Sequence, residues 1–248
     1  MKHIIVSLML LLALGVQAQT QLNDAERLML KGNVNSMLET TRNAHNQIVG
    51  QPIRYIFNDR GYYEHIHYFD TAGTLAITVH YLYNKKNILV KDTRLLEPFS
   101  QLDGITEYSF DKRRRTLRGD LLLNDTVTLT TFFCFDRQGR ETEIRQMNEH
   151  GEIESRVAKE YDRFGNMVRR IHFDGKDNLY RGEYVYRYDT EGYVVEENVM
   201  DLDRVRWSLL YSYVFDSHGN WTHCYKFRVT TTEASLYEVV TRQIDYAE

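Results

Sequence analysis

The stretch YDRFGNMVRRIHFDGKDNLYRGEYVYRYDTEGYVVEE, residues 161–197, contains the same short motif twice. An aromatic residue is followed by Asp, two free positions and Gly, first at 161–165 and again at 188–192. An Asp side chain in a turn accepts hydrogen bonds from backbone N–H groups two residues on, and Gly takes the left-handed conformation that closes a type I turn with a G1 bulge. Each copy therefore predicts a tight turn between two antiparallel strands.

The motif repeats along the chain at a regular interval. Its anchor residues lie 25 to 27 positions apart, at 57, 83, 110, 135, 161, 188 and 215, and a second set at 69, 147, 173 and 200 follows 12 positions after its partner in the first. A period near 26 with two turns is one β-hairpin plus a link to the next. The 18 Tyr and 11 Phe suit a half-buried pleated surface. The sequence therefore predicts an all-β fold, a long antiparallel β-meander of repeated hairpins that is curved or rolled into a barrel-like single sheet.

The turn geometry also predicts which residues face each other across a hairpin. Because the bulge fixes the register, the residue before Asp faces the residue two positions after Gly. The expected pairs are Phe57 with Tyr63, Phe69 with Leu75, Tyr161 with Met167, Tyr188 with Val194, and Phe215 with Trp221. Alternation then predicts an aromatic ladder on the anchor face, with Tyr55, Tyr81, Tyr108, Phe133, Tyr186 and Tyr213. The opposite face, expected to meet water, carries Glu64, His80, Glu107, Arg156, Arg170, Arg187 and Glu197.

The first 18 residues have the pattern of a secretory signal peptide. Lys2 and His3 precede an apolar run from Ile4 to Val16, which is too short to span a bilayer, and small residues before Ala18 suit cleavage after it. We predict an exported protein, located in the periplasm, on the cell surface or outside the cell. The formal net charge of −4 is typical of a protein that does not bind nucleic acid.

The ends and the middle of the chain depart from the repeat. Residues 19–31 predict a short helix capped by Asn23 or Asp24, and a first strand follows up to Thr41. Residues 84–104 hold the weakest repeat, with Pro98 in a loop, and a last strand is predicted at about 236–246. Because no stretch is rich in Pro, Gly or Ser, residues 19–248 are predicted to form one domain, without a transmembrane segment.

The strings YDRFGNMVRR (161–170), YDTEGYVVEE (188–197) and FDSHGNWTHC (215–224) resemble the YD repeats of bacterial RHS-type proteins. They are most similar to the short secreted YD-repeat-like proteins of uncharacterised function, in which a strand like LKGNVNSMLET (30–40) precedes the repeats. The similarity covers most of residues 29–230. It implies an antiparallel β-meander that curls into a barrel or shell, and it implies no activity. The toxin-encapsulating role of the large RHS shells is not carried over to this shorter chain.

The segment FDSHGNWTHCYKF (215–227) holds the strongest candidates for binding. Simple alternation predicts Trp221, His223 and Tyr225 on the aromatic face and Cys224 on the other. His223 lies four residues after its turn glycine, and the matching positions in other repeats are polar: His65, Glu143, Arg169 and Glu196. A polar row between aromatic side chains on a concave face is typical of a glycan or peptide groove, whereas a flatter sheet would leave the row merely hydrated. The predicted binding residues are Trp221, His223, Tyr225, His65, Arg169 and Glu196.

Other candidate sites are less specific. His65 and His67 have a spacing that metal sites use, but alternation places His80 on the other face and offers no further ligand, so neither metal nor cofactor is predicted. Cys134 and Cys224 are expected on the outer face about seven strands apart, too far for a disulfide unless the sheet rolls up. The basic cluster 112–115 with Arg118 predicts an exposed hairpin tip, suited to an acidic surface or lipid headgroups.

Three functions remain open at the level of sequence. The first is an exported, non-enzymatic binding or envelope-associated protein whose ligand is a glycan or another envelope protein. The second is a polysaccharide hydrolase or lyase, with His223 or His65 as base and Arg169 steadying a carboxylate. The third is a structural component of a cell-envelope assembly. An outer-membrane barrel is not expected, because charged residues occupy outward mid-strand positions.

Overall fold

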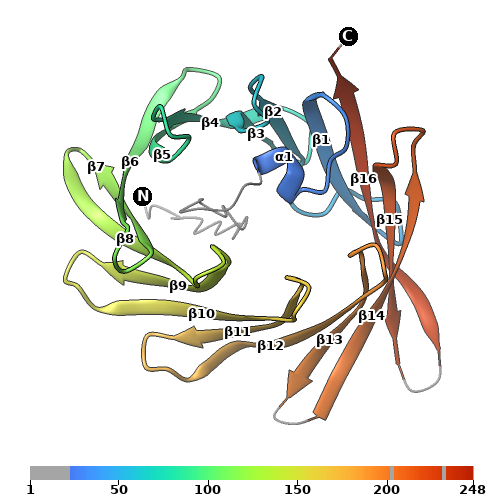
Figure 1. Cartoon of the computed structure of the whole chain (residues 1–248). Coiled ribbons are helices and arrows are strands. Elements are labelled where there is room, and N and C mark those ends of the chain that lie inside the picture. Colours follow the sequence, from blue (N-terminus) through green and yellow to red (C-terminus); the bar gives the residue numbers. More distant parts are fainter. Residues whose placement is uncertain (1–22, 202–203, 231–232, 248) are drawn as a thin grey trace.

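The computed structural model describes residues 23–201, 204–230 and 233–247, which form one closed antiparallel barrel of 16 strands (Figure 1). Consecutive strands pair along the chain, and β16 closes the ring against β1. The helix α1 spans Asp24–Arg27 and has Asn23 as its N-cap, as predicted. The strands are β1 Val34–Asn43, β2 Ile53–Phe57, β3 Tyr63–Phe69, β4 Leu75–Tyr83, β5 Leu89–Leu96, β6 Gln101–Asp111, β7 Thr116–Leu123, β8 Thr126–Phe135, β9 Glu141–Asn148, β10 Ile153–Tyr161, β11 Met167–Asp174, β12 Leu179–Tyr188, β13 Val194–Asp201, β14 Arg204–Phe215, β15 Trp221–Val229 and β16 Ala234–Tyr246. The predicted all-β meander is confirmed, and its closure answers the question of an open or closed sheet.

The turns follow the predicted chemistry. In the turn between β10 and β11, the Asp162 carboxylate accepts hydrogen bonds from the backbone N–H groups of Phe164 and Asn166, both at 2.9 Å. Gly165 has a φ of +95°, a conformation that other residues adopt only at a cost. Turns that follow even-numbered strands lie at one end of the barrel, beside α1, and turns that follow odd-numbered strands lie at the opposite end. We call these the α1 end and the far end.

The predicted register holds at the turns. All five expected pairs occur, including Phe57 with Tyr63 and Phe215 with Trp221. Beyond the turn, however, the alternation slips by one residue. Phe215 pairs with Trp221 but Val214 pairs with His223, so Thr222 is an extra residue in the bulged strand. Cys224 therefore pairs with Tyr213 on the face of Trp221, which corrects the predicted faces of His223, Tyr225 and Cys224.

The same slip corrects other predicted faces. The inner positions are Ile66, Ile144, Arg170, Glu197 and Cys224, each five residues after a turn glycine rather than four. Arg170 and Glu197 were expected in water and instead point into the barrel. His80 was expected on the opposite face of the sheet from His65, but the two residues are direct cross-strand partners.

The core lies on the inner face of the barrel, near α1. Met37, Tyr55, Tyr63 and Ile66 are buried in one cluster, and α1 lies inside the ring of strands against it (Figure 1). A second buried cluster comprises Leu89, Leu117, Phe133, Phe135, Ile144 and Val157. The Asp24 carboxylate of α1 accepts hydrogen bonds from the Tyr63 N–H and the Tyr83 hydroxyl, both at 3.0 Å. Burial raises the pKa of this carboxyl.

The inner face also holds ion pairs. Lys159 bonds to Glu141, and Arg242 lies 3.0 Å from Glu39 and donates a second bond to the Leu28 carbonyl beside α1. A closed ring of 16 strands is too wide for side chains alone to fill. The helix and these inner ion pairs occupy space that a smaller barrel would fill with apolar residues.

The outer face is polar at mid-strand. Its charged side chains include Lys91, Glu107, Arg118, Arg145 and Arg169, each cross-strand from another outward residue. A lipid-facing barrel wall needs an apolar band at these positions. Within the described part of the chain, no helix is long and apolar enough to span a bilayer.

The corrected register makes a stability prediction. Ile66→Ala is expected to lower the free energy of unfolding by about 3 kcal/mol, because Ile66 is completely buried and its loss leaves a cavity. The neighbouring His65→Ala is expected to cost less than about 1 kcal/mol, because His65 lies on the outer face. Urea unfolding of both variants measures the difference, and equal losses would contradict the bulged register.

Candidate functional site

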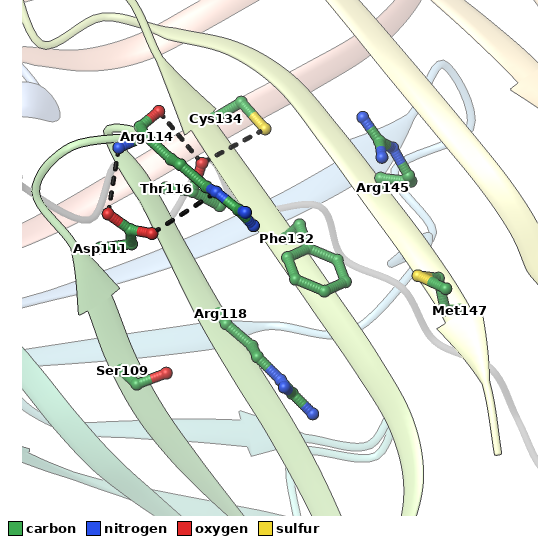
Figure 2. Close-up of a pocket in the computed structure, with 9 residues that line it drawn as sticks. All are labelled: Ser109, Asp111, Arg114, Thr116, Arg118, Phe132, Cys134, Arg145 and Met147. Carbon is green, nitrogen blue, oxygen red and sulfur yellow. Dashed lines mark hydrogen bonds and ion pairs between the residues drawn. The ribbon is translucent and has the colours of Figure 1, made fainter. Parts of the chain in front are cut away.

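The outer face of β6–β9 has a hollow of about 510 Å³. Figure 2 shows the side chains that line it, which come from four neighbouring strands and from the turn between β6 and β7. They are Ser109, Asp111, Arg114, Thr116, Arg118, Phe132, Cys134, Arg145 and Met147.

The strand register brings these side chains together. Ser109 pairs with Arg118, Arg118 with Phe132, and Phe132 with Arg145, so one row of outward positions runs across four strands. A second row runs from Asp111 through Thr116 to Cys134. Alternation alone makes all of these residues point outward.

A local turn positions the third arginine. The Asp111 carboxylate accepts hydrogen bonds from the N–H groups of Arg113 at 2.9 Å and Arg114 at 3.0 Å. The Arg114 guanidinium then lies 3.7 Å from Asp111, over the upper part of the hollow (Figure 2). No glycine is present here, and Arg115 takes the left-handed conformation instead, with a φ of +51°.

Three guanidinium groups line the hollow, and each has a carboxylate partner. Arg118 is paired with Asp120 at 2.9 Å and Arg145 with Glu143 at 3.1 Å, but neither carboxylate lines the hollow. The lining residues alone have a formal charge of +2, and the carboxylates of Asp120 and Glu143 beside them bring the group to zero. The hydrogen bond to Glu143 raises the pKa of Arg145, so its guanidinium keeps its charge at any physiological pH.

The floor of the hollow is less polar. Phe132, Cys134 and Met147 are partly buried there, and the Arg118 guanidinium carbon lies 5.9 Å from the centre of the Phe132 ring. The Thr116 hydroxyl donates to the Cys134 sulfur at 4.0 Å. Burial raises the pKa of the Cys134 thiol, which is therefore neutral at physiological pH and a weak nucleophile. An apolar floor beside guanidinium groups suits an anion that carries an apolar ring face.

The structure separates the predicted residues of the segment 215–227. Trp221 lies on the inner face, where the Arg242 guanidinium carbon is 3.5 Å from its ring centre. His223 and Tyr225 lie on the outer face, with ring centroids 6.2 Å apart. The sheet itself divides them from Trp221, so the predicted shared aromatic face is wrong.

The other predicted residues lie apart on the outer face. His65 on β3 packs against His80, with ring centroids 4.5 Å apart. Arg169 on β11 bridges Glu160 at 3.0 Å and Glu183 at 2.6 Å. Glu196 on β13 is paired with Arg187 at 2.8 Å. Because three different parts of the barrel wall carry them, these residues do not converge on one groove, and a binding role for any of the six stays a prediction.

Metal ligands do not gather in the described part of the chain. No group of three or more His, Cys, Asp or Glu residues there is placed to hold an ion. Both cysteines are free thiols, Cys134 on the outer face and Cys224 on the inner face.

Sequence reasoning found only part of the hollow. The basic cluster that includes Arg114 and Arg118 is visible in the sequence as an exposed tip. Phe132 and Arg145 were missed, because they belong to β8 and β9, which meet the basic cluster only through strand pairing. Extending the predicted strand register across β6–β9 would have placed both residues in one row with Arg118.

The chain thus folds into a closed antiparallel β-barrel whose outer wall has a hollow lined by three arginines. No protein-family model matches the chain, and no curated protein matches its sequence. Among solved structures it is similar to a porin-like protein from Bacteroides uniformis, with a TM-score of 0.42 and 10% identity over 87% of this chain and 98% of that one. It is also similar to part of the Photorhabdus luminescens Tc holotoxin pore, with a TM-score of 0.30 and 9% identity over 84% of this chain and 16% of that one. Both likenesses are weak, so the functional proposal rests on the residues of the hollow.

Proposed function

We propose that this protein is an exported, non-enzymatic binding protein of the cell envelope, and that its outer hollow holds an acidic saccharide. The observation that carries the proposal is the set of three arginines, Arg114, Arg118 and Arg145, around a floor that contains Phe132. The YD-like turn motif supports an extracytoplasmic repeat protein, and the predicted signal peptide supports export.

The chemistry of the lining favours this ligand class. Guanidinium groups bind carboxylate and sulfate groups through paired, charge-assisted hydrogen bonds. Saccharide rings pack their C–H faces on aromatic side chains, and Phe132 offers such a face. A neutral sugar would leave the arginines to water and to their existing carboxylate partners. The hollow therefore favours uronate or sulfated sugars over neutral ones.

Binding of an oligouronate tests the proposal. The double variant Arg118→Ala, Arg145→Ala is expected to raise its Kd at least about tenfold, because two charge-assisted contacts are lost. Isothermal titration calorimetry at low and high salt measures the effect, and binding is expected to weaken with salt. Chain length of the oligouronate after incubation is measured in parallel and is expected to stay unchanged.

Arg187→Ala is the matched control. Arg187 is also an outward, ion-paired arginine, but it lies on β12, away from the hollow. Its replacement is expected to leave the Kd unchanged. Equal weakening by both variants would point to general electrostatic attraction and would overturn the hollow as the site. Shortening of the oligouronate would replace the binding function with a hydrolase or lyase.

A further inference from the structure

One arc of the α1 end of the barrel is strongly basic. Five consecutive turns on this arc, 58–62, 84–88, 111–115, 136–140 and 162–166, contain ten Lys and Arg residues against four Asp, a net charge of +6. The other two turns at this end, 189–193 and 216–220, hold Asp189, Glu191 and Asp216, so the seven turns together have a net charge of +3. We call the exposed cations of the five basic turns the basic rim: Arg60, Lys85, Lys86, Lys112, Arg113, Arg114, Arg115, Arg137 and Arg163. Because every turn joins an even-numbered strand to the next, all of them lie at the same end.

The far end has the opposite sign. In its described turns, at 70–74, 97–100, 124–125, 148–152, 174–178 and at Glu233, eight Asp and Glu stand against Lys176, a net charge of −7. The whole chain has a formal net charge of only −4. Charge is therefore separated along the barrel axis, and the net charge of the whole chain does not reveal this separation.

The basic rim is available for a partner. Among the described residues, Lys85, Lys86, Lys112, Arg113 and Arg137 make no ion pair. Asp136 and Asp162, by contrast, accept hydrogen bonds from the backbone of their own turns. One tip also exposes an aromatic ring: the Phe164 side chain is 74% exposed and has the Arg163 guanidinium carbon 4.6 Å from its ring centre.

We propose that the basic rim docks the barrel end-on onto an anionic lipid surface. Clustered Lys and Arg side chains are attracted to the negative potential of such a surface, and an exposed aromatic ring suits the bilayer interface. Strands of about nine residues separate the two ends by roughly 20–30 Å. The acidic far end then lies beyond the screening length of about 8 Å at physiological salt and does not oppose docking.

A lipid surface fits the rim better than the acidic end of a second copy does. Five neighbouring turn tips on one arc of the barrel end can all meet a continuous flat surface at once, when the barrel tilts toward that arc and away from the acidic turns 189–193 and 216–220. A second copy would bind only if its acidic far-end turns stood at the same angular positions around the barrel axis as the basic turns of the first copy. Docking would hold the hollow close to the surface, since Arg114 belongs to both features.

Vesicle sedimentation tests the proposal with the exported chain. The protein is expected to bind vesicles of phosphatidylcholine with about 30% phosphatidylglycerol, to ignore vesicles of phosphatidylcholine alone, and to be released by salt. The triple variant Lys85→Glu, Lys86→Glu, Arg113→Glu is expected to lose at least about tenfold in vesicle affinity, because each lost cation weakens attraction to the surface.

A charge-matched variant is the control. Lys176→Glu, Arg204→Glu, Arg206→Glu changes the net charge equally at the far end, where all three side chains are exposed, and it is expected to keep vesicle binding. The neutral triple Lys85→Gln, Lys86→Gln, Arg113→Gln repeats the test if the reversed rim disturbs folding. Equal loss in the rim and far-end variants would overturn the proposal. Self-association of the protein in the absence of vesicles, if the rim variant or the far-end variant abolished it, would also overturn the proposal. That result would assign the basic rim to contact with a second copy. None of these substitutions removes a side chain that lines the hollow, so the far-end triple and the neutral rim triple are expected to keep oligouronate affinity, which separates this test from that of the hollow.

Discussion

Replacing Lys159 by Met is expected to lower the free energy of unfolding by about 4 kcal/mol at pH 8, because breaking a buried ion pair leaves an uncompensated charge. The Lys159 side chain on β10 is 8% exposed and that of its partner Glu141 on β9 is 5% exposed. The second carboxylate oxygen of Glu141 is buried and has no hydrogen-bond partner among the described residues. Lys159 thus compensates the buried negative charge of Glu141.

The loss is expected to depend on pH. Burial raises the pKa of Glu141 above its ordinary value, and Lys159 opposes that rise. Without Lys159 the folded-state pKa rises further, so the folded protein binds the proton more tightly than the unfolded chain does. The Lys159→Met variant is therefore least impaired below the unfolded pKa of about 4.3, and the impairment grows as the pH rises through the folded pKa.

Urea unfolding at about pH 5 and about pH 8 measures this difference. Lys226→Met is the matched control, because the pair of Lys226 with Glu238 at 3.1 Å is also inward-facing but more exposed. It is expected to cost less than about 1 kcal/mol at either pH. The double variant Lys159→Met, Glu141→Gln is expected to recover most of the stability at pH 8. A loss that is the same at both pH values would show that Glu141 is not the stranded charge.

Asn220→Ala is expected to cost about 3 kcal/mol, because it leaves partly buried polar groups of Lys31 and Tyr246 without their partner. Asn220 is 1% exposed and lies in the turn between β14 and β15. Its side-chain oxygen accepts from the Lys31 N–H at 2.6 Å, and its amide donates to the Lys31 carbonyl at 2.8 Å and to the Tyr246 hydroxyl at 2.7 Å. One side chain thus joins the segment before β1, the last hairpin and the end of β16, where the barrel closes.

The repeat supplies the control for this prediction. Asn166 holds the equivalent turn position between β10 and β11, but its amide bonds only to Asp162 of its own turn. Asn166→Ala is expected to cost less than about 1 kcal/mol. Thermal and urea unfolding of the two variants compare them directly. If both Asn variants lose the same stability, Asn220 serves only its turn and the closure has another origin.

The turns and their register were predictable because they depend on neighbouring residues. The Asp or Asn oxygen, the two free positions and the Gly at positive φ are set within five residues, and cross-strand pairs such as Phe57 with Tyr63 follow from the bulge. The Asn23 cap was predictable for the same reason, since its reciprocal bonds with Glu26 span one helical turn.

The faces beyond the bulge were predicted wrongly although the signal was present. Two residues of the bulged strand, Trp221 and Thr222, stand opposite one residue of its partner, so simple alternation fails from that point on. The residues five positions after the turn glycines include the apolar Ile66, Ile144 and Cys224 but also Arg170 and Glu197, whereas those four positions after are all polar. The three apolar members mark the inner face, and the two charged ones obscured it.

By itself, then, the sequence determined the hairpins, their period, their turns and their local pairing, because these depend on contacts within about 26 residues. Only the tertiary structure decided that β16 closes against β1, that α1 lies inside, and that Arg114, Arg118 and Arg145 meet around Phe132. Those arrangements depend on the twist and number of all 16 strands and on the partner of each bulged residue. The separation of charge between the two ends of the barrel depends on both the sequence and the tertiary structure. Every charge is visible in the sequence, but alternate turns are assigned to opposite ends only once the strands form a single up-and-down ring.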